Sequence, residues 1–245
     1  MKAPDFKPRG ECRRPFLGAL SRRTKGFTLT ELLVILAVAS VLAAIVIPVL
    51  VRSRAKSKLT VCLSNLQKVN HAVLLFAEDN KDFLPSVDTS PAPGGWWWYK
   101  EQVKSFAGLT GASSAQDKVF ACPNDRGYGE EAKIQPFCRS QKHDYTSYVF
   151  NGVNLPGMPN IAGRTVGSIK DPAKTLLVME WTAHAPLSWH KSRTGKKNSP
   201  FYNDAESVVG FIDGHVGLVK FYFDGTNPAY TMDPIPGYDY RYSGD

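Results

Sequence analysis

Glu31 is the residue whose position poses the clearest chemical problem. It is the only ionisable side chain in the 25 residues from Phe27 to Val51. A carboxylate near the middle of a bilayer costs about 2.5–3.5 kcal/mol on insertion scales when it has no partner. If this stretch crosses a membrane, a positive group must neutralise Glu31, and its apolar neighbours supply none.

Cysteine is the other residue type with obvious reactivity. The chain has four: Cys12 near the N-terminus, then Cys62, Cys122 and Cys138 at long separations. No two of them form the C-x-x-C pair typical of zinc sites, so a structural disulfide in an oxidising compartment is favoured. A Cys62–Cys122 bond would tie a helix to the following domain and is preferred. A Cys122–Cys138 bond stays an alternative, and either choice leaves one thiol unassigned.

Catalytic signatures are absent from the sequence. It contains no G-x-S-x-G, no H-E-x-x-H and no Walker loop. His184 and His190 are six residues apart in a segment that contains proline, so they lack the i, i+4 spacing of helical metal ligands. We interpret them as solvated or core histidines and do not expect an enzyme.

The apolar stretch is the first element that must position these residues. As a helix, 25 residues would be about 38 Å long, enough to span a bilayer with some tilt. Eight basic and two acidic side chains precede the stretch, so residues 1–26 hold six of the eight excess positive charges. This favours a cytoplasmic N-terminus, although four basic residues also follow the span: Arg52, Arg54, Lys56 and Lys58. The concentration of positive charge in residues 1–26 argues against nucleic-acid binding, which needs basic surface on the folded domain.

Two general interpretations of the span leave Glu31 unexplained. A secretory signal would end at a small-x-small site, which Ala37-Val38-Ala39 could supply, and a secreted enzyme would then start near Ser40. A plain signal anchor needs only the apolar residues. Neither supplies a partner for the carboxylate.

Residues 25–34, KGFTLTELLV, closely resemble the prepilin signature of type IV pilins and type II secretion pseudopilins. The resemblance implies that prepilin peptidase cleaves between Gly26 and Phe27 and methylates the new N-terminus at Phe27. Glu31 would then pair with the positive α-amino group of Phe27, typically on a neighbouring subunit. Such a pair makes two buried charges tolerable and fixes the register of subunits in a filament.

The helix is expected to continue beyond the membrane. Pro48 should bend it, because proline removes a backbone donor, and a proline near this point is similar to the pilin pattern. Apolar residues then recur at steps of three and four, which predicts an amphipathic helix: Leu59, Cys62, Leu63, Leu66, Val69, Val73 and Phe76. The expected polar face carries Lys58, Asn65, Lys68, Asn70 and Glu78.

The expected organisation has four parts. A basic leader (1–26) is removed, an assembly helix (27–51) follows, an amphipathic continuation (52–80) extends it, and a globular head (81–245) completes the chain.

The head resembles bacterial pilin-like proteins whose C-terminal region is named for an H-x9-DG motif. The matching segments, in order, are VCLSNLQKVNHAVLLFAEDNKDFLPS from residue 61, FACPND from 120, SYVFNG from 147, PAKTLLVME from 172 and GFIDGHV from 210. The position of the motif's histidine holds Asn203, so His190 is the nearest candidate to accompany Asp213 and Gly214, in an H-x9-DG-like region at 190–220. The pilin resemblance implies an α+β fold, with the long helix packed on an antiparallel sheet.

The pattern of the head supports such a sheet. Residues 175–181 and 207–212 are rich in Val, Leu, Ile and Phe, and 216–223 alternates, as strands do. Asp213-Gly214 is a strong hairpin-turn signal. A Ca²⁺ or other ligand site at Asp204 and Asp213 is an alternative use of these acids, although there is no D-x-D-x-D loop. No cofactor is expected.

Three consecutive tryptophans follow a Pro/Gly loop. On a strand, Trp96 and Trp98 would point to one face and Trp97 to the other. Core packing is the default interpretation. An exposed aromatic platform for polysaccharide or for partner subunits is the alternative.

Together these features predict a pilin-like or pseudopilin subunit that acts by association. Its expected partners are prepilin peptidase, other pilin-like subunits and the bacterial inner membrane. The N-terminus would be cytoplasmic and the head would lie in the periplasm or on a cell-surface filament. The alternative is a membrane-anchored extracytoplasmic binding module that does not polymerise.

Overall fold

The computed structural model describes residues 26–87, 95–127, 135–152, 158–183, 187–190, 205–222 and 232–245. Residues 1–25 of the leader, Asp204 and His184 lie outside the described residues. The chain divides into two compact units, one up to Val49 and the other from Leu50 to Asp245.

One long helix, α1 (Leu29–Asp79), contains Pro48 and continues into the C-terminal unit. It ends where Lys81 and Asp82 adopt positive φ angles of 57° and 71°, and Asp82 N donates to Ala77 O over 2.8 Å. The sequence predicts this helix to within about two residues, because its apolar period persists until polar residues and left-handed backbone stop it.

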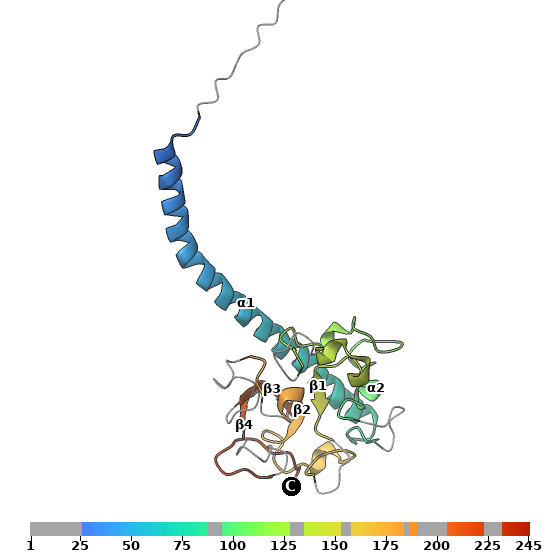
Figure 1. Ribbon diagram of the computed structural model, residues 1–245. Coiled ribbons are helices and arrows are strands. Elements are labelled where there is room, and N and C mark those ends of the chain that lie inside the picture. The colour runs from blue at the N-terminus through green and yellow to red at the C-terminus, as the bar shows by residue number, and fades with distance from the viewer. Residues whose placement is uncertain are drawn as a thin grey trace, which may run out of the picture. The chain divides into compact units, whose positions relative to one another are not determined.

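The head contains a four-stranded antiparallel sheet in the order β1-β2-β3-β4 (Figure 1). The strands are β1 (Tyr148–Phe150), β2 (Leu176–Glu180), β3 (Ala205–Phe211) and β4 (Val216–Phe221). β1 and β2 are buried along their whole length, whereas β4 is an edge strand with Leu218 and Lys220 exposed. The predicted α+β class is confirmed.

In the described part of the chain, short helical segments lie between these elements, four of them between α1 and β1, one between β1 and β2 and one between β2 and β3. They are α2 (Lys100–Val103), η2 (Lys118–Phe120), η3 (Phe137–Arg139), η4 (Gln141–His143), η5 (Val166–Ser168) and η6 (Trp181–Ala183).

The β3–β4 hairpin turns at Asp213-Gly214. Gly214 has φ 95°, and its N–H donates to Phe211 O over 3.0 Å. His215 N donates to Asp213 Oδ1 over 3.1 Å, so the aspartate side chain braces its own turn. The turn chemistry explains both residues of the Asp-Gly pair.

The C-terminal part of α1 packs on this sheet. Its buried residues follow helical steps from Cys62 to Ala77, and Gln67 Nε2 donates to Gly214 O over 3.0 Å. Asn70, which the sequence pattern placed on the polar face, is instead fully buried, and that assignment is wrong. Its Nδ2 donates to Phe211 O over 3.0 Å, and its carboxamide occupies the space that Gly210 leaves by having no side chain.

The tryptophans do not lie on a strand. They precede α2 in a turn, where Trp98 is 2% exposed and donates from Nε1 to Gly152 O over 3.1 Å. Trp96 and Trp97 lie at centroid distances of 5.8 and 5.6 Å from Trp181. The idea of an exposed platform shared by Trp96 and Trp98 is therefore wrong, because Trp98 belongs to the core.

The close approach of Asn70 and Gly210 gives a test of how α1 meets the sheet. A methyl group at Gly210 would overlap the Asn70 carboxamide, so Gly210→Ala should lower the free energy of unfolding by about 1–3 kcal/mol. Urea unfolding of the full-length chain in detergent, followed by tryptophan fluorescence, measures this change.

Gly217→Ala on β4 is the matched control, since an added methyl there meets no atom within 4 Å. It should change stability by no more than about 0.5 kcal/mol. Equal stabilities of the two alanine variants would contradict the packing described here.

Candidate functional site

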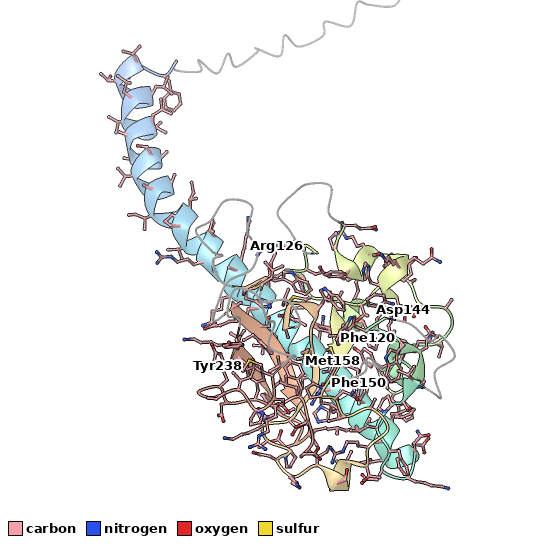
Figure 2. The ribbon with its side chains drawn as sticks, turned by 60° about the horizontal axis from the view of Figure 1, so that its bottom comes forward. Phe120, Arg126, Asp144, Phe150, Met158 and Tyr238 are labelled. Carbon is pink, nitrogen blue, oxygen red and sulfur yellow. A yellow bond between two sulfur atoms is a disulfide. The ribbon has the colours of Figure 1, made fainter. Side chains whose placement is uncertain are left out.

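The first candidate site is the apolar N-terminal segment, residues 26–51. Every residue of this segment is exposed, including Phe27, Leu32, Ile35 and Val41. Figure 2 shows its side chains pointing outward on all sides of the helix. Among the described residues, α1 is the one helix that is long and apolar enough to cross a membrane. Apolar surface on this scale needs lipid or other protein to cover it.

Glu31 helps to start this helix. Its Oε2 accepts hydrogen bonds from Thr28 N and from Thr28 Oγ1, both 2.8 Å long, while Glu31 N donates to Thr28 Oγ1 over 3.3 Å. Thr28 and Glu31 thus form a reciprocal capping box, which satisfies backbone donors at the first turn. Glu31 Oε1 makes no hydrogen bond to any described residue. The acid can cap the helix and still accept a bond from an ammonium group.

Gly26 and Phe27 lie immediately before the helix. Both are exposed and outside α1, and no atom lies within 4 Å of the position that a Cβ on Gly26 would take. The predicted cleavage position is therefore in irregular backbone, which a peptidase can bind more readily than a helix.

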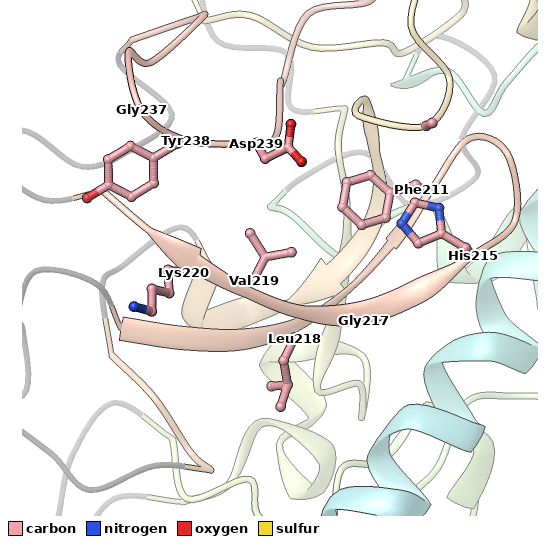
Figure 3. A pocket seen from close by; sticks show the side chains of 10 residues that line it. Phe211, His215, Gly217, Leu218, Val219, Lys220, Gly237, Tyr238 and Asp239 are labelled. Carbon is pink, nitrogen blue, oxygen red and sulfur yellow. The ribbon is translucent and has the colours of Figure 1, made fainter.

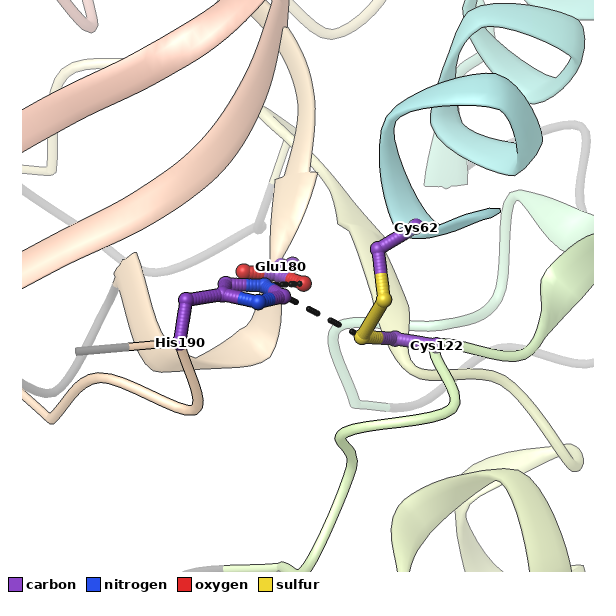
Figure 4. A group of neighbouring side chains, drawn as sticks. All are labelled: Cys62, Cys122, Glu180 and His190. Atoms are coloured by element: carbon purple, nitrogen blue, oxygen red, sulfur yellow. Dashed lines mark hydrogen bonds and ion pairs between the residues drawn. A yellow bond between two sulfur atoms is a disulfide. The ribbon is translucent and has the colours of Figure 1, made fainter. Parts of the chain in front are cut away.

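The second candidate site is a group of four side chains, Cys62, Cys122, Glu180 and His190, which we call the cysteine–histidine cluster (Figure 4). Cys62 on α1 and Cys122 after η2 form a disulfide with a Cα–Cα separation of 4.7 Å. Cys138 is a free thiol. The bond covalently joins α1 to the loop that follows η2.

Side-chain hydrogen bonds fix the loop that carries Cys122. Asn65, one turn beyond Cys62, donates from Nδ2 to Lys118 O and Ala121 O over 2.9 and 2.8 Å. Cys122 N donates to Ser147 Oγ over 3.0 Å, and Ser147 Oγ donates to Asp125 Oδ2 over 2.8 Å. The sulfur of Cys122 is held in place by α1 on one side and by the residue before β1 on the other.

Glu180 and His190 complete the cluster. His190 Nε2 lies 2.7 Å from Glu180 Oε1 and 3.9 Å from Cys122 Sγ. Glu180 ends β2, and its Oε2 accepts Val208 N over 2.9 Å. The side chains of Glu180 and His190 are 0% and 2% exposed. A buried carboxylate is tolerated here because both of its oxygens have donors.

Asn124 orients the imidazole. Its Nδ2 lies 2.9 Å from His190 Nδ1. In the neutral tautomer in which Nδ1 accepts from this amide, Nε2 carries the proton and donates it to Glu180.

The structure gives His190 and Asp213 different partners. His190 contacts Glu180, Cys122 and Asn124, whereas Asp213 Oδ1 lies 2.6 Å from His215 Nδ1 in the hairpin turn. Within the described part of the chain, the cysteine–histidine cluster is the group with ligand atoms close enough to hold a metal, and Asp213 is not in it. Asp204, the other acid of the predicted Ca²⁺ site, lies outside the described residues.

A groove of about 550 Å³ borders β4 and the C-terminal segment (Figure 3). His215, Lys220, Tyr238 and Asp239 line it, together with Phe211, on which the His215 ring stacks at a centroid distance of 4.2 Å. Its mixture of aromatic and charged groups could accept a polar ligand.

Comparison with known proteins defines the class of the N-terminal segment. Residues 21–47 match the family model of the prokaryotic N-terminal methylation motif. The chain thus has a prepilin-type N-terminus, and the predicted resemblance to type IV pilins is confirmed for this region. The comparisons do not show the H-x9-DG domain.

One named relative is the type IV major pilin protein PilA of Myxococcus xanthus (strain DK1622). It is 32% identical to this chain over 98 residues, which are 39% of this chain and 44% of PilA. The chain thus matches less than half of the length of that relative. No solved structure matches. The similarity to a type IV pilin thus covers 98 residues of this chain.

The sequence did not predict the cysteine–histidine cluster. Cys62 and Cys122 were expected to pair, but Glu180 had no assigned role and His190 was assigned by analogy to a turn motif. The four residues are separated by 60, 58 and 10 positions, so no local spacing reveals them.

Cys138 provides a test of the burial around the cluster. Burial and then the charge of Asp125 raise the pKa of its thiol to about 11, from a usual value near 9. Because the thiolate is the reactive form, alkylation of Cys138 at pH 8 should be about a hundredfold slower than that of an exposed cysteine. Mass spectrometry of iodoacetamide-treated full-length protein measures the rate.

In the native protein Cys62 and Cys122 should stay unlabelled, since they are bonded. After unfolding without reductant, Cys138 should label at the rate of an exposed thiol. Rapid labelling of native Cys138 would contradict its placement, and labelling of all three cysteines would contradict the disulfide.

Proposed function

We propose that this chain is a pilin-like subunit of a type IV pilus-like or type II secretion assembly. In this proposal prepilin peptidase cleaves between Gly26 and Phe27 and methylates Phe27, and the mature subunit acts by helix-mediated association. The observation that carries it is the exposed apolar segment 27–51, helical from Leu29 and interrupted by one acid at the position that can meet a new N-terminal amine.

The geometry of Glu31 supports this role. In the uncleaved chain, the nitrogen of Phe27 is an amide and carries no charge. Cleavage would convert it to an ammonium group four residues before Glu31, whose Oε1 is unbonded in the described structure. On helices stacked in a filament, the ammonium of one subunit could reach the carboxylate of the next, and the pair would set their axial offset.

The proposed location is the bacterial inner membrane. The N-terminus would be cytoplasmic, in line with the eight basic side chains that precede the span. The head would lie in the periplasm or on a surface filament, where the Cys62–Cys122 disulfide can persist.

A second candidate is a membrane-anchored binding module that does not polymerise. The groove beside β4, with Lys220, Tyr238 and Asp239 in its lining, favours this alternative. Ligand binding by the full-length chain, together with unchanged filaments and secretion in a deletion strain, would support it over the subunit proposal.

Gly26→Val should block maturation. The peptidase that processes prepilins cleaves after glycine. Valine at position 26 would place a branched side chain next to the scissile bond, in space that is open at Gly26. The chain would be co-expressed with a prepilin peptidase, and the mass of its N-terminal peptide measured. The natural chain should begin at methylated Phe27, and the variant should keep its leader uncleaved.

Gly217→Ala is the control variant and should be processed normally. A Gly26→Val chain that begins at methylated Phe27 would count against the proposal. A natural chain that begins near Ser40 would replace it with an exported domain.

Glu31→Gln separates the charge of Glu31 from its capping role. Glutamine also completes a capping box, so the helix start should be preserved. Loss of the charge should lower incorporation into assemblies at least tenfold, because removing one partner of a buried ion pair costs about 3–5 kcal/mol. Quantification of the subunit in sheared filaments and in membranes measures the partition.

Glu78→Gln, an exposed acid of the same helix beyond the apolar segment, is the control and should assemble normally. Normal assembly of Glu31→Gln combined with failure of Glu31→Ala would leave Glu31 only the capping role.

A further inference from the structure

The cysteine–histidine cluster brings together a set of atoms that a disulfide alone does not require. One ligand atom from each of Cys62, Cys122, Glu180 and His190 lies within 4.8 Å of the other three. The residues come from α1, the loop after η2, the end of β2 and the segment 187–190 (Figure 4). Two sulfurs, one imidazole nitrogen and one carboxylate oxygen form a donor set that suits Zn²⁺.

The distances are close to those of a tetrahedral site. Zinc bonds of about 2.0–2.3 Å place neighbouring ligand atoms about 3.3–3.8 Å apart. His190 Nε2 is 3.9 Å from Cys122 Sγ and 2.7 Å from Glu180 Oε1. Shifts of about 1 Å would reach the tetrahedral spacing, provided that the two sulfurs are no longer bonded to each other.

The disulfide and the metal therefore exclude each other. We propose that reduction of the Cys62–Cys122 bond converts this cluster into a structural Zn²⁺ site with the ligands Cys62 Sγ, Cys122 Sγ, Glu180 carboxylate and His190 Nε2. The proposal concerns the C-terminal unit and does not depend on the proposed function.

The conversion balances in electrons and protons. A dithiol reductant gives two electrons to the S–S bond and becomes a disulfide itself, and the two cysteine sulfurs take up two protons. Binding of Zn²⁺ then releases these two protons to solvent, since thiolates are the ligands. The proton of His190 Nε2 is released as well, and Nδ1 takes one up.

The surroundings of the cluster allow this change of tautomer. A 180° rotation of the Asn124 carboxamide would place Oδ1, an acceptor, against the newly protonated Nδ1. Glu180 would retain the bond from Val208 N to Oε2 while Oε1 binds the metal. Metal-bound histidines commonly have such a partner on the other ring nitrogen.

Burial indicates a structural site and not a catalytic one. Cys62 and Glu180 are 0% exposed, Cys122 is 1% exposed and the His190 side chain 2%. Four protein ligands leave no position for water or substrate, which is the arrangement of structural zinc sites. Either state, disulfide or zinc, would link α1 to the rest of the head.

The test uses the full-length chain in detergent, prepared in two forms. One form is kept oxidised. The other is reduced with a phosphine, which is oxidised to its oxide with the oxygen of water, and is then freed of phosphine under anaerobic conditions. Titration with Zn²⁺, and with Co²⁺ as a spectroscopic probe, follows. The reduced form should bind one equivalent and show thiolate-to-Co²⁺ charge-transfer absorption, and the oxidised form should bind at least about 100-fold more weakly.

Variants assign the ligands. His190→Gln should weaken Zn²⁺ binding by at least about 100-fold, and Asn124→Ala by about 10–100-fold, as for loss of an outer hydrogen bond. Cys138→Ser is the matched control and should bind as the natural chain does, because Cys138 is a free thiol outside the cluster. The oxidised His190→Gln protein, examined by unfolding, shows whether the variant folds.

Three results would overturn the proposal. The first is a reduced natural chain that binds no stoichiometric Zn²⁺, which decides the matter whatever the variants do. The second is equal binding by the oxidised and reduced forms. The third is loss of binding in Cys138→Ser with retention in His190→Gln, which would place the metal elsewhere.

Discussion

The apolar surface of residues 27–51 is exposed and is not covered by any other part of the chain that the structure describes. At about 25 cal/mol per Å² of apolar area, exposure of such a segment to water is strongly unfavourable. Under the proposed function, lipid would cover this surface before assembly and neighbouring helices would cover it afterwards, and both environments are free of water. The segment could move from lipid to neighbouring helices because, apart from Glu31, neither environment contains polar groups that would lose hydrogen-bond partners.

The second part of α1 faces the opposite requirement, since it must stay attached to the head. The structure meets it in three chemically different ways. An apolar stripe from Cys62 to Ala77 is buried against the core. Side-chain amides of Asn65, Gln67 and Asn70 donate to backbone carbonyls of the head. A disulfide adds a covalent tie that does not depend on exclusion of water. The hydrogen bonds from these side-chain amides also fix the rotation of the helix about its axis, which apolar contacts alone specify poorly.

Elements with a local signal could be predicted from the sequence. The helix follows from its period, the β3–β4 turn from its Asp-Gly pair, and strands β2, β3 and β4 from their apolar or alternating runs, whereas the three-residue strand β1 was not predicted. Asn70 was misplaced because a helical pattern shows only which face a residue is on, and not whether a glycine on a distant strand leaves room for it. Core packing, the default interpretation of the tryptophans, holds for Trp98, which bonds Gly152 O, but the turn that places it there is not the strand considered for these residues. The role of Glu180 depends on His190 and Val208, which approach it only when the sheet forms.

The position of the cysteine–histidine cluster along α1 has a mechanical meaning. Residues 50–58 of the helix are exposed, Leu59 is partly buried, and Cys62 is the first buried helical residue of the C-terminal unit. A force that pulls the exposed helix away from the head would act first at this point, where the helix begins to separate from the sheet. Hydrogen bonds and apolar contacts would yield one after another under such a force, whereas a disulfide at the first buried position bears the force itself and shields the contacts that follow it. Asn65, one turn further along the helix, hydrogen-bonds the loop that carries Cys122 and so holds that loop against α1. A crosslink at Ala77, the other end of the buried stripe, would leave the helix contacts near Cys62 unprotected against such a force.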